Sequence, residues 1–227
     1  MNVPELIVET LPVGHLQCNC TILGDPLSGE AIVVDPGGEA EMLSERLLEL
    51  NLQVVSIIHT HAHLDHFLAS GKMKETTGAK LALHRDDYFL WNMLEDQCRM
   101  FEIPFEKTPP PDHWLEHEEE IELMGIQGKA IHTPGHTPGS MCFLFEKQKL
   151  LIAGDTLFKG SIGRTDLWGG DFQEIEKSIQ EELNLVSSIQ NLNGEMRPTG
   201  IRQCIGKLND TDIAASSVPI DDMRTAT

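Results

Sequence analysis

The sequence predicts a single-domain α/β fold with both antiparallel and parallel strands, and three observations support this prediction. Short apolar segments separated by turn residues recur in residues 6–34 and again in residues 121–153, which is the pattern of two β meanders. Between them, strand-like and helix-like patterns alternate, as they do in βα units. The chain has 227 residues, of which 40% are hydrophobic, and this is enough for one core.

Charge and cysteine content narrow the classes of function. The formal net charge of −19, without any Lys- or Arg-rich run, argues against binding to nucleic acid or to an anionic membrane. The five cysteines contain no C-x-x-C pair, which favours reduced thiols over a disulfide framework. The amino terminus lacks a basic start followed by a long apolar run, and no stretch of 18 apolar residues occurs. We therefore expect a soluble, cytoplasmic protein.

The first meander consists of strands at residues 6–11, 18–23 and 31–34, with a Pro-Gly turn between the first two. Asp35-Pro36-Gly37-Gly38 ends the third strand and precedes an amphipathic helix at residues 39–50. Asp35 is either a simple turn residue or a carboxylate that orients a metal-ligating histidine.

The βα units follow, with strands at residues 54–58 and 80–84 and helices at residues 67–76 and 86–100. The proline-rich segment 103–113 is predicted to be a loop. Three histidines outside any cluster are interpreted as surface or packing residues: His84, His113 and His117.

The second meander is predicted from four apolar segments, at residues 121–124, 126–131, 140–145 and 150–153. A rigid loop with two Pro-Gly pairs precedes the third of these strands and presents His136, and Asp155 follows the fourth strand. Residues 160–171 form a glycine-rich loop, and Asp171 caps a helix that extends to about residue 185.

The stretch His59-Thr60-His61-Ala62-His63-Leu64-Asp65-His66 directly follows a predicted buried strand. Side chains two residues apart on an extended backbone point the same way, so His61 and His63 can converge on one metal ion. Asp65 and His66 can turn to a neighbouring point where the chain enters a helix. The alternative is a histidine-rich surface loop in which Asp65 only caps that helix. Ligand-type residues at the ends of three buried strands favour one shared site.

Three motifs resemble those of the metallo-β-lactamase superfamily: Thr60-His61-Ala62-His63-Leu64-Asp65-His66, Gly135-His136-Thr137-Pro138-Gly139-Ser140 and Gly154-Asp155-Thr156. Together with the loop Gly163-Arg164-Thr165-Asp166, they look most like the glyoxalase II-like (hydroxyacylglutathione hydrolase-like) branch. The resemblance spans about residues 5–184 and implies a four-layer αββα sandwich. We therefore expect a metallo-β-lactamase-like domain at residues 1–184 and an atypical, poorly ordered tail at residues 185–227.

The resemblance implies a site for two metal ions built from six residues: His61, His63 and His136 for one ion, Asp65 and His66 for the second, and Asp155 bridging both. Zinc is the expected cofactor, as one or two ions, with iron or manganese as alternatives. The resemblance also gives Asp65 a part in proton transfer. Arg164 or Lys159 would contact the carboxylate of a glutathione conjugate.

The activity implied by the resemblance is hydrolysis of a small-molecule thioester, such as S-lactoylglutathione, by a metal-bound hydroxide. The related persulfide dioxygenases, which use one iron held by two histidines and an aspartate, provide an alternative enzyme class. A catalytically weakened, non-enzymatic form is the second alternative.

The chain departs from the family pattern at its end. The family's last ligand is a histidine in a Gly-His-Gly-like stretch after one more buried strand, and no histidine follows His136 here. We therefore expect the second metal ion to rely on Asp65, His66 and Asp155, and one sheet to be incomplete with an unpaired edge. A changed reading frame, an alternative exon and sequence divergence are each consistent with this ending. We also expect the chain to lack the family's separate helical substrate domain.

Overall fold

The computed structural model describes residues 6–123, 126–158, 161–183, 205–207 and 213–214, and two six-stranded sheets form its centre. The first sheet has the strand order β1-β2-β3-β4-β5-β6. Its strands are β1 (Ile7–Val13), β2 (Cys18–Gly24), β3 (Glu30–Val34), β4 (Gln53–Ile58), β5 (Lys80–His84) and β6 (His113–Leu115). Strands β1 to β3 form the predicted antiparallel meander, whereas β3 to β6 run parallel. Parallel neighbours require a crossover, and helices supply each one.

The described helices are α1 (Ala40–Glu49), α2 (Leu64–Phe67), α3 (Ser70–Thr77), α4 (Tyr88–Asn92), α5 (Leu94–Met100) and α6 (Phe172–Ser178). A 3₁₀ turn, η1 (Arg85–Asp87), precedes α4, and a π-helical turn, η2 (Ile179–Leu183), continues α6. Asp171 caps α6 as predicted, because its side chain accepts hydrogen bonds from the backbone N–H groups of Gln173 and Glu174.

The second sheet is antiparallel throughout and has the order β14-β13-β10-β9-β8-β7. Its strands are β7 (Glu120–Leu123), β8 (Ile126–His132), β9 (Met141–Phe145), β10 (Leu150–Ile152), β13 (Ile205–Lys207) and β14 (Ile213–Ala214). A short ribbon of β11 (Leu157–Phe158) and β12 (Ser161–Ile162) follows β10.

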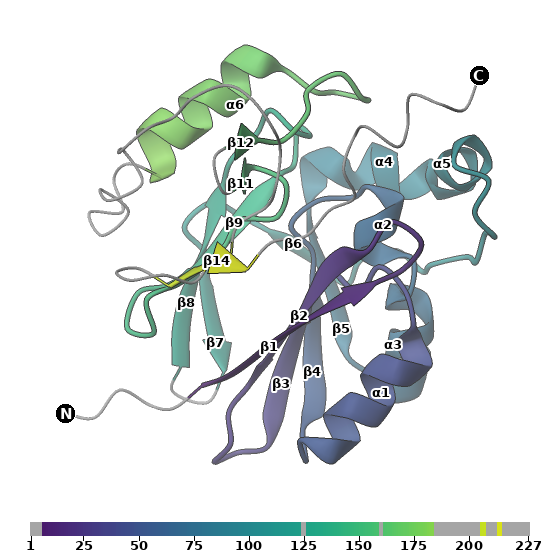
Figure 1. Cartoon of the computed structure of the whole chain (residues 1–227), viewed down its shortest axis with the longest axis vertical. Coiled ribbons are helices and arrows are strands. Elements are labelled where there is room, and N and C mark those ends of the chain that lie inside the picture. The colour runs from purple at the N-terminus through teal and green to yellow at the C-terminus, as the bar shows by residue number, and fades with distance from the viewer. Residues whose placement is uncertain (1–5, 124–125, 159–160, 184–204, 208–212, 215–227) are drawn as a thin grey trace.

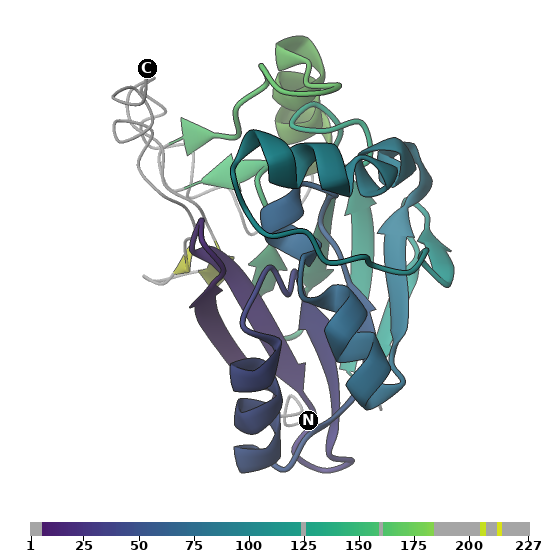
Figure 2. The ribbon, with the colours of Figure 1, turned by 90° about the vertical axis from the view of Figure 1, so that its right-hand side faces the viewer.

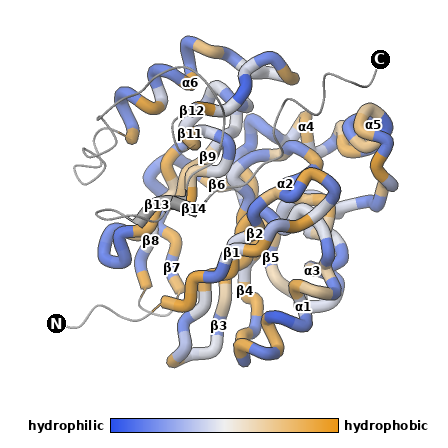
Figure 3. The backbone as a smooth tube through the Cα atoms, in the orientation of Figure 1, coloured by the Kyte–Doolittle hydropathy of each residue, from blue (hydrophilic) through white to orange (hydrophobic). Residues whose placement is uncertain are grey.

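Three buried clusters separate four layers, which confirms the predicted αββα sandwich. Figure 1 shows helices α1 to α5 on one side of the paired sheets and α6 on the other, and Figure 2 shows α1 and α3 lying across the first sheet. Side chains alternate along β3, so that Val33 packs against the helices while Ile32 and Val34 pack against the second sheet. The helices alternate between hydrophilic and hydrophobic residues in Figure 3, as helices that cover a sheet should.

Several predicted elements differ in detail. The helix expected at residues 67–76 begins earlier and is divided into α2 and α3, and the one at residues 86–100 is divided into η1, α4 and α5. Strand β6 overlaps the predicted loop at His113 and was missed, because three residues are too few to show a period.

The end of the chain also differs from expectation. One sheet was predicted to be incomplete, but in the second sheet β13 pairs with β10 at Leu150, Leu151 and Ile152, and β14 pairs with β13. Apart from β13 and β14, the predicted tail at residues 185–227 lies outside the described residues. Across the described part of the chain, no helix is both long and apolar enough to cross a membrane. The described cysteines, Cys18, Cys20, Cys98 and Cys142, are buried and free.

Candidate metal centre

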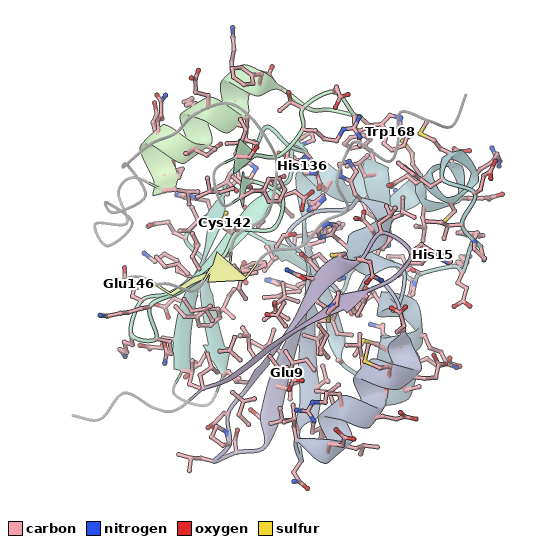
Figure 4. All side chains as sticks on the ribbon, in the orientation of Figure 1. Glu9, His15, His136, Cys142, Glu146 and Trp168 are labelled. Carbon is pink, nitrogen blue, oxygen red and sulfur yellow. The ribbon has the colours of Figure 1, made fainter. Side chains whose placement is uncertain are left out.

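The candidate site lies where several strands end. Asp35 follows β3, the stretch beginning at His59 follows β4, and Asp155 follows β10. The loop between β8 and β9 supplies His136, which lies in Figure 4 near the top of the molecule, between α6 and α4. The structure therefore gathers the residues that the sequence placed at strand ends.

The rings of His61, His63 and His136 meet at one point. The Nε2 atom of His61 lies 3.1 Å from Nδ1 of His63, which lies 2.9 Å from Nε2 of His136, and the two Nε2 atoms are 3.2 Å apart. All three side chains are almost completely buried. These three nitrogens form one group with the spacing of metal ligands.

The opposite ring nitrogens show which atoms carry protons. Nδ1 of His136 lies 2.7 Å from the carbonyl oxygen of Arg164, to which it must donate, so Nε2 presents a lone pair in the neutral imidazole. Thr60 donates its hydroxyl to Asp35 at 2.6 Å, and that hydroxyl oxygen therefore accepts from Nδ1 of His61 at 3.1 Å. Two lone pairs thus face each other across 3.2 Å.

A metal ion fits this arrangement. Ligands about 2.0–2.1 Å from a tetrahedral zinc ion lie about 3.3–3.4 Å from one another, close to the spacing of the three nitrogens. Burial and the neighbouring imidazoles lower the pKa values of His61 and His63 well below their ordinary value, so both rings are neutral near pH 7. Among the described residues, the remaining nitrogen of His63, Nε2, is buried without a hydrogen-bond partner. A cation among the three nitrogens would satisfy the facing lone pairs.

A second group lies beside the first. Nε2 of His66 is 3.4 Å from Oδ1 of Asp155 and 3.7 Å from Oδ2 of Asp65. The other carboxylate oxygen of Asp155 is 3.6 Å from Nε2 of His136, so Asp155 lies between the two groups. Burial raises the pKa of the Asp65 carboxyl, although the His66 imidazole opposes the shift. The structure thus brings all six predicted ligand residues together.

Asp35 and Cys18 contact the outer nitrogen of His66, Nδ1, which faces away from Asp65 and Asp155. Oδ2 of Asp35 lies 3.0 Å from Nδ1 of His66, and the Cys18 thiol lies 3.4 Å from the same nitrogen. Burial raises the pKa of Cys18 to about 12, so it is a neutral thiol at pH 7. Asp35 consequently orients His66 so that Nε2 faces Asp65 and Asp155.

Of the two residues predicted to contact the substrate, the structure describes Arg164 but not Lys159. Lys159 lies outside the described residues. The Arg164 side chain is 35% exposed, and its guanidinium already forms two hydrogen bonds with Asp166, at 2.6 and 2.8 Å. Its backbone carbonyl, which the sequence did not indicate, positions His136. Trp168 adds a ring 6.4 Å from that of His63.

Sequence reasoning missed two buried side chains that hold the ligand loops, Asp87 and Gln97. Asp87 accepts hydrogen bonds from the backbone of Ala62 and Gly139, and Gln97 bonds to the backbone of Ala62 and Leu64. Asp87 lies just beyond the end of β5, so the rule that singled out Asp35 and Asp155 could have found it. Gln97 sits within a helical segment that carries no comparable signal.

A third group comprises His84, Asp86 and His132. The two imidazoles stack with centroids 4.1 Å apart and an interplanar angle of 17°, and Nε2 of His132 lies 2.8 Å from the carbonyl oxygen of Pro138. The Asp86 side chain is 58% exposed. These contacts pack the end of β5 against the end of β8.

Comparisons with known proteins agree with this geometry. The model of the Metallo-beta-lactamase superfamily matches residues 13–199. Hydroxyacylglutathione hydrolase GloC of Haemophilus influenzae is 39% identical over 178 residues, which cover 78% of this chain and 84% of that protein. The crystal structure of BLEG-1 B3 metallo-beta-lactamase is 34% identical with a TM-score of 0.73, covering 79% of this chain and 87% of that one. TTHA1623 in a di-iron-bound form is 30% identical with a TM-score of 0.69, covering 78% and 86%.

Proposed function

Because the chain belongs to the metallo-beta-lactamase superfamily, we propose that it is a metal-dependent thioesterase that hydrolyses glutathione thioesters such as S-lactoylglutathione. The observation that carries this proposal is the convergence of His61, His63 and His136 beside a second group that shares Asp155. The similarity to the GloC hydrolase supports the choice of substrate class.

The ligand roles follow from the contacts. His61, His63 and His136 would hold one cation, and Asp65 and His66 would contribute to a second, with Asp155 shared. We propose zinc because imidazole nitrogens dominate the first group, with iron as the alternative that the di-iron relative suggests. Such cations, when bound, lower the pKa of water and polarise a carbonyl group.

The chain's own residues would supply orientation and proton transfer. The carbonyl of Arg164 and the carboxylate of Asp35 each bind the outer nitrogen of a histidine, which turns the inner nitrogen of His136 and of His66 towards the centre. The Asp65 side chain is 22% exposed, so it can accept a proton from an attacking water. The guanidinium of Arg164 would bind the substrate carboxylate by exchanging its contact with Asp166.

Steady-state assays on the zinc-loaded and iron-loaded protein test this proposal. We expect S-lactoylglutathione hydrolysis to exceed that of an uncharged thioester, and we expect His61→Ala to abolish it. His113→Ala is the control, because His113 is exposed and pairs with Glu119. Oxygen uptake with glutathione persulfide, or hydrolysis of a β-lactam without thioester hydrolysis, would contradict the proposal. Inactivity of the well-folded, metal-loaded chain towards every substrate would favour a non-enzymatic role.

A further inference from the structure

Asp87 joins the two loops that carry the first ligand group. One of its carboxylate oxygens, Oδ2, accepts hydrogen bonds from the backbone N–H of Ala62 at 2.9 Å and from the hydroxyl of Thr137 at 2.8 Å. The other, Oδ1, accepts from the backbone N–H of Gly139 at 2.6 Å. Ala62 lies between His61 and His63, and Thr137 follows His136. One carboxylate therefore connects both ligand loops.

The surroundings keep this carboxylate in place. Asp87 has no exposed surface, so its charge is stable only because three donors are directed at it. A Cβ at Gly139 would lie 2.8 Å from Oδ1 of Asp87, which means that only glycine allows so close an approach. Gln97 holds the same residue from its other side by donating to the carbonyl of Ala62, which belongs to the next peptide group, at 3.1 Å. The backbone between His61 and His63 is thus fixed on both sides.

We propose that Asp87 is a positioning residue that sets the spacing between the His61–His63 loop and His136, and thereby the metal affinity of the three-histidine group. The inference rests on the proposed metal centre but not on the identity of the substrate. The carboxylate does not touch the cation or the reacting atoms, and acts through the main chain of the ligand loops.

The amide of an asparagine at this position cannot satisfy all three donors. If its oxygen remains with Ala62 and Thr137, its NH₂ group faces the N–H of Gly139, and two donors then oppose each other. The two loops must separate to relieve this contact. Outer partners of metal ligands change metal affinity by about 10- to 100-fold when they are substituted, and we expect a loss of this size for Asp87→Asn.

The experiment titrates the metal-free full-length chain with Zn²⁺ and Co²⁺ in competition with a chromogenic chelator, and records the visible spectrum of bound Co²⁺. We expect Asp87→Asn to weaken binding of the first metal equivalent by about 10- to 100-fold. The visible absorption bands of bound Co²⁺ should also change, because the ligand geometry changes. Asp112→Asn is the matched control, since Asp112 also accepts a backbone N–H, from Leu81 at 2.7 Å, and pairs with Lys74. It should lower the melting temperature and leave the affinity and the spectrum unchanged.

The outcomes separate this inference from the proposed function, because no substrate is used. Wild-type affinity and spectrum in Asp87→Asn would overturn the inference, as would the same loss of affinity in Asp112→Asn. If Asp87→Asn does not fold, Thr137→Val removes one of the three donors to Asp87 and should weaken binding of the first metal equivalent by about 2- to 10-fold. An unchanged metal affinity in Thr137→Val would then overturn the inference. A chain that binds the metal with the expected Asp87 dependence but hydrolyses no thioester would refute only the proposed activity.

Discussion

Oδ2 of Asp35 lies 3.0 Å from Nδ1 of His66, and both side chains are almost completely buried. Asp35 directly follows β3 and has a positive φ of 54°, a conformation that aspartate tolerates better than most residues. The bend turns the carboxylate back across the end of the sheet, where it also accepts the backbone N–H of Thr60 at 2.8 Å. Asp35 is thus both a turn residue and the partner of a candidate ligand.

Asp35→Asn should lower the stability of the metal-free protein. The amide has one acceptor oxygen where the carboxylate has two, so a buried donor of Thr60 or His66 loses its partner. We expect a loss of about 1–3 kcal/mol in the free energy of unfolding, measured by urea denaturation. Asp86→Asn, at a largely exposed carboxylate, should change it by less than about 0.5 kcal/mol. Equal effects of the two substitutions would show that the contact with His66 does not contribute.

His136→Ala should remove most of the bound metal. The substitution deletes one of three converging nitrogens and leaves the carbonyl of Arg164 without its donor. Elemental analysis after dialysis should show less than about a tenth of the wild-type metal content, since losing a ligand costs more than losing an outer partner. His113→Ala should retain full content. The assignment fails if both variants keep the same amount of metal.

Metal stoichiometry should reflect the unequal ligand sets. The first group has three histidines and the shared Asp155, which completes a tetrahedral site, whereas the second has Asp65, His66 and the same aspartate. We expect about one tightly bound ion per chain after dialysis, and a second only at high added metal. We also expect slow hydrolysis at one equivalent, because a second cation would help to stabilise the developing charge. Two retained equivalents on a well-folded chain would show that a further residue completes the second set.

Arg164→Ala should separate substrate binding from structure. The net charge of −19 repels an anionic substrate unless a local cation attracts it, so KM should rise more for a glutathione thioester than for an uncharged one. The backbone carbonyl that positions His136 remains in this variant, so kcat should change by less than about threefold. Asp166→Asn frees the guanidinium and should lower KM for the anionic thioester. An identical KM change for both substrates would make Arg164 purely structural.

Gly163→Ala should disturb the centre, because an added Cβ would overlap the carbonyl oxygen of Asp155 and lie 3.0 Å from Nδ1 of His136. We expect metal affinity to fall by at least about tenfold in a chelator competition assay. Gly78→Ala is the control, since its Cβ would meet no atom within 4 Å and only its positive φ of 73° is strained. It should cost about 1–2 kcal/mol of stability without a change in metal affinity.

The sequence by itself determined the features that depend on neighbouring residues. Strand and helix periods over a few residues were sufficient to predict the two meanders and the βα units between them, whereas the four-layer sandwich was implied by the family resemblance. The spacing of His61 and His63 predicted that their rings share a face, since alternate side chains of an extended chain point the same way. Turn residues and a strand end singled out His136 and Asp155, the resemblance assigned them as ligands, and the structure places them beside His61 and His63.

Only the tertiary structure decided which distant segments hold these ligands. Asp87 and Thr137 are 50 positions apart, His136 and Arg164 are 28 apart, and Gln97 and Leu64 are 33 apart. Such contacts leave no periodic pattern, because they depend on how whole elements pack rather than on the local backbone. The same reason explains β13: its pairing with β10 depends on where the chain returns to the sheet, and short-range patterns do not encode that return.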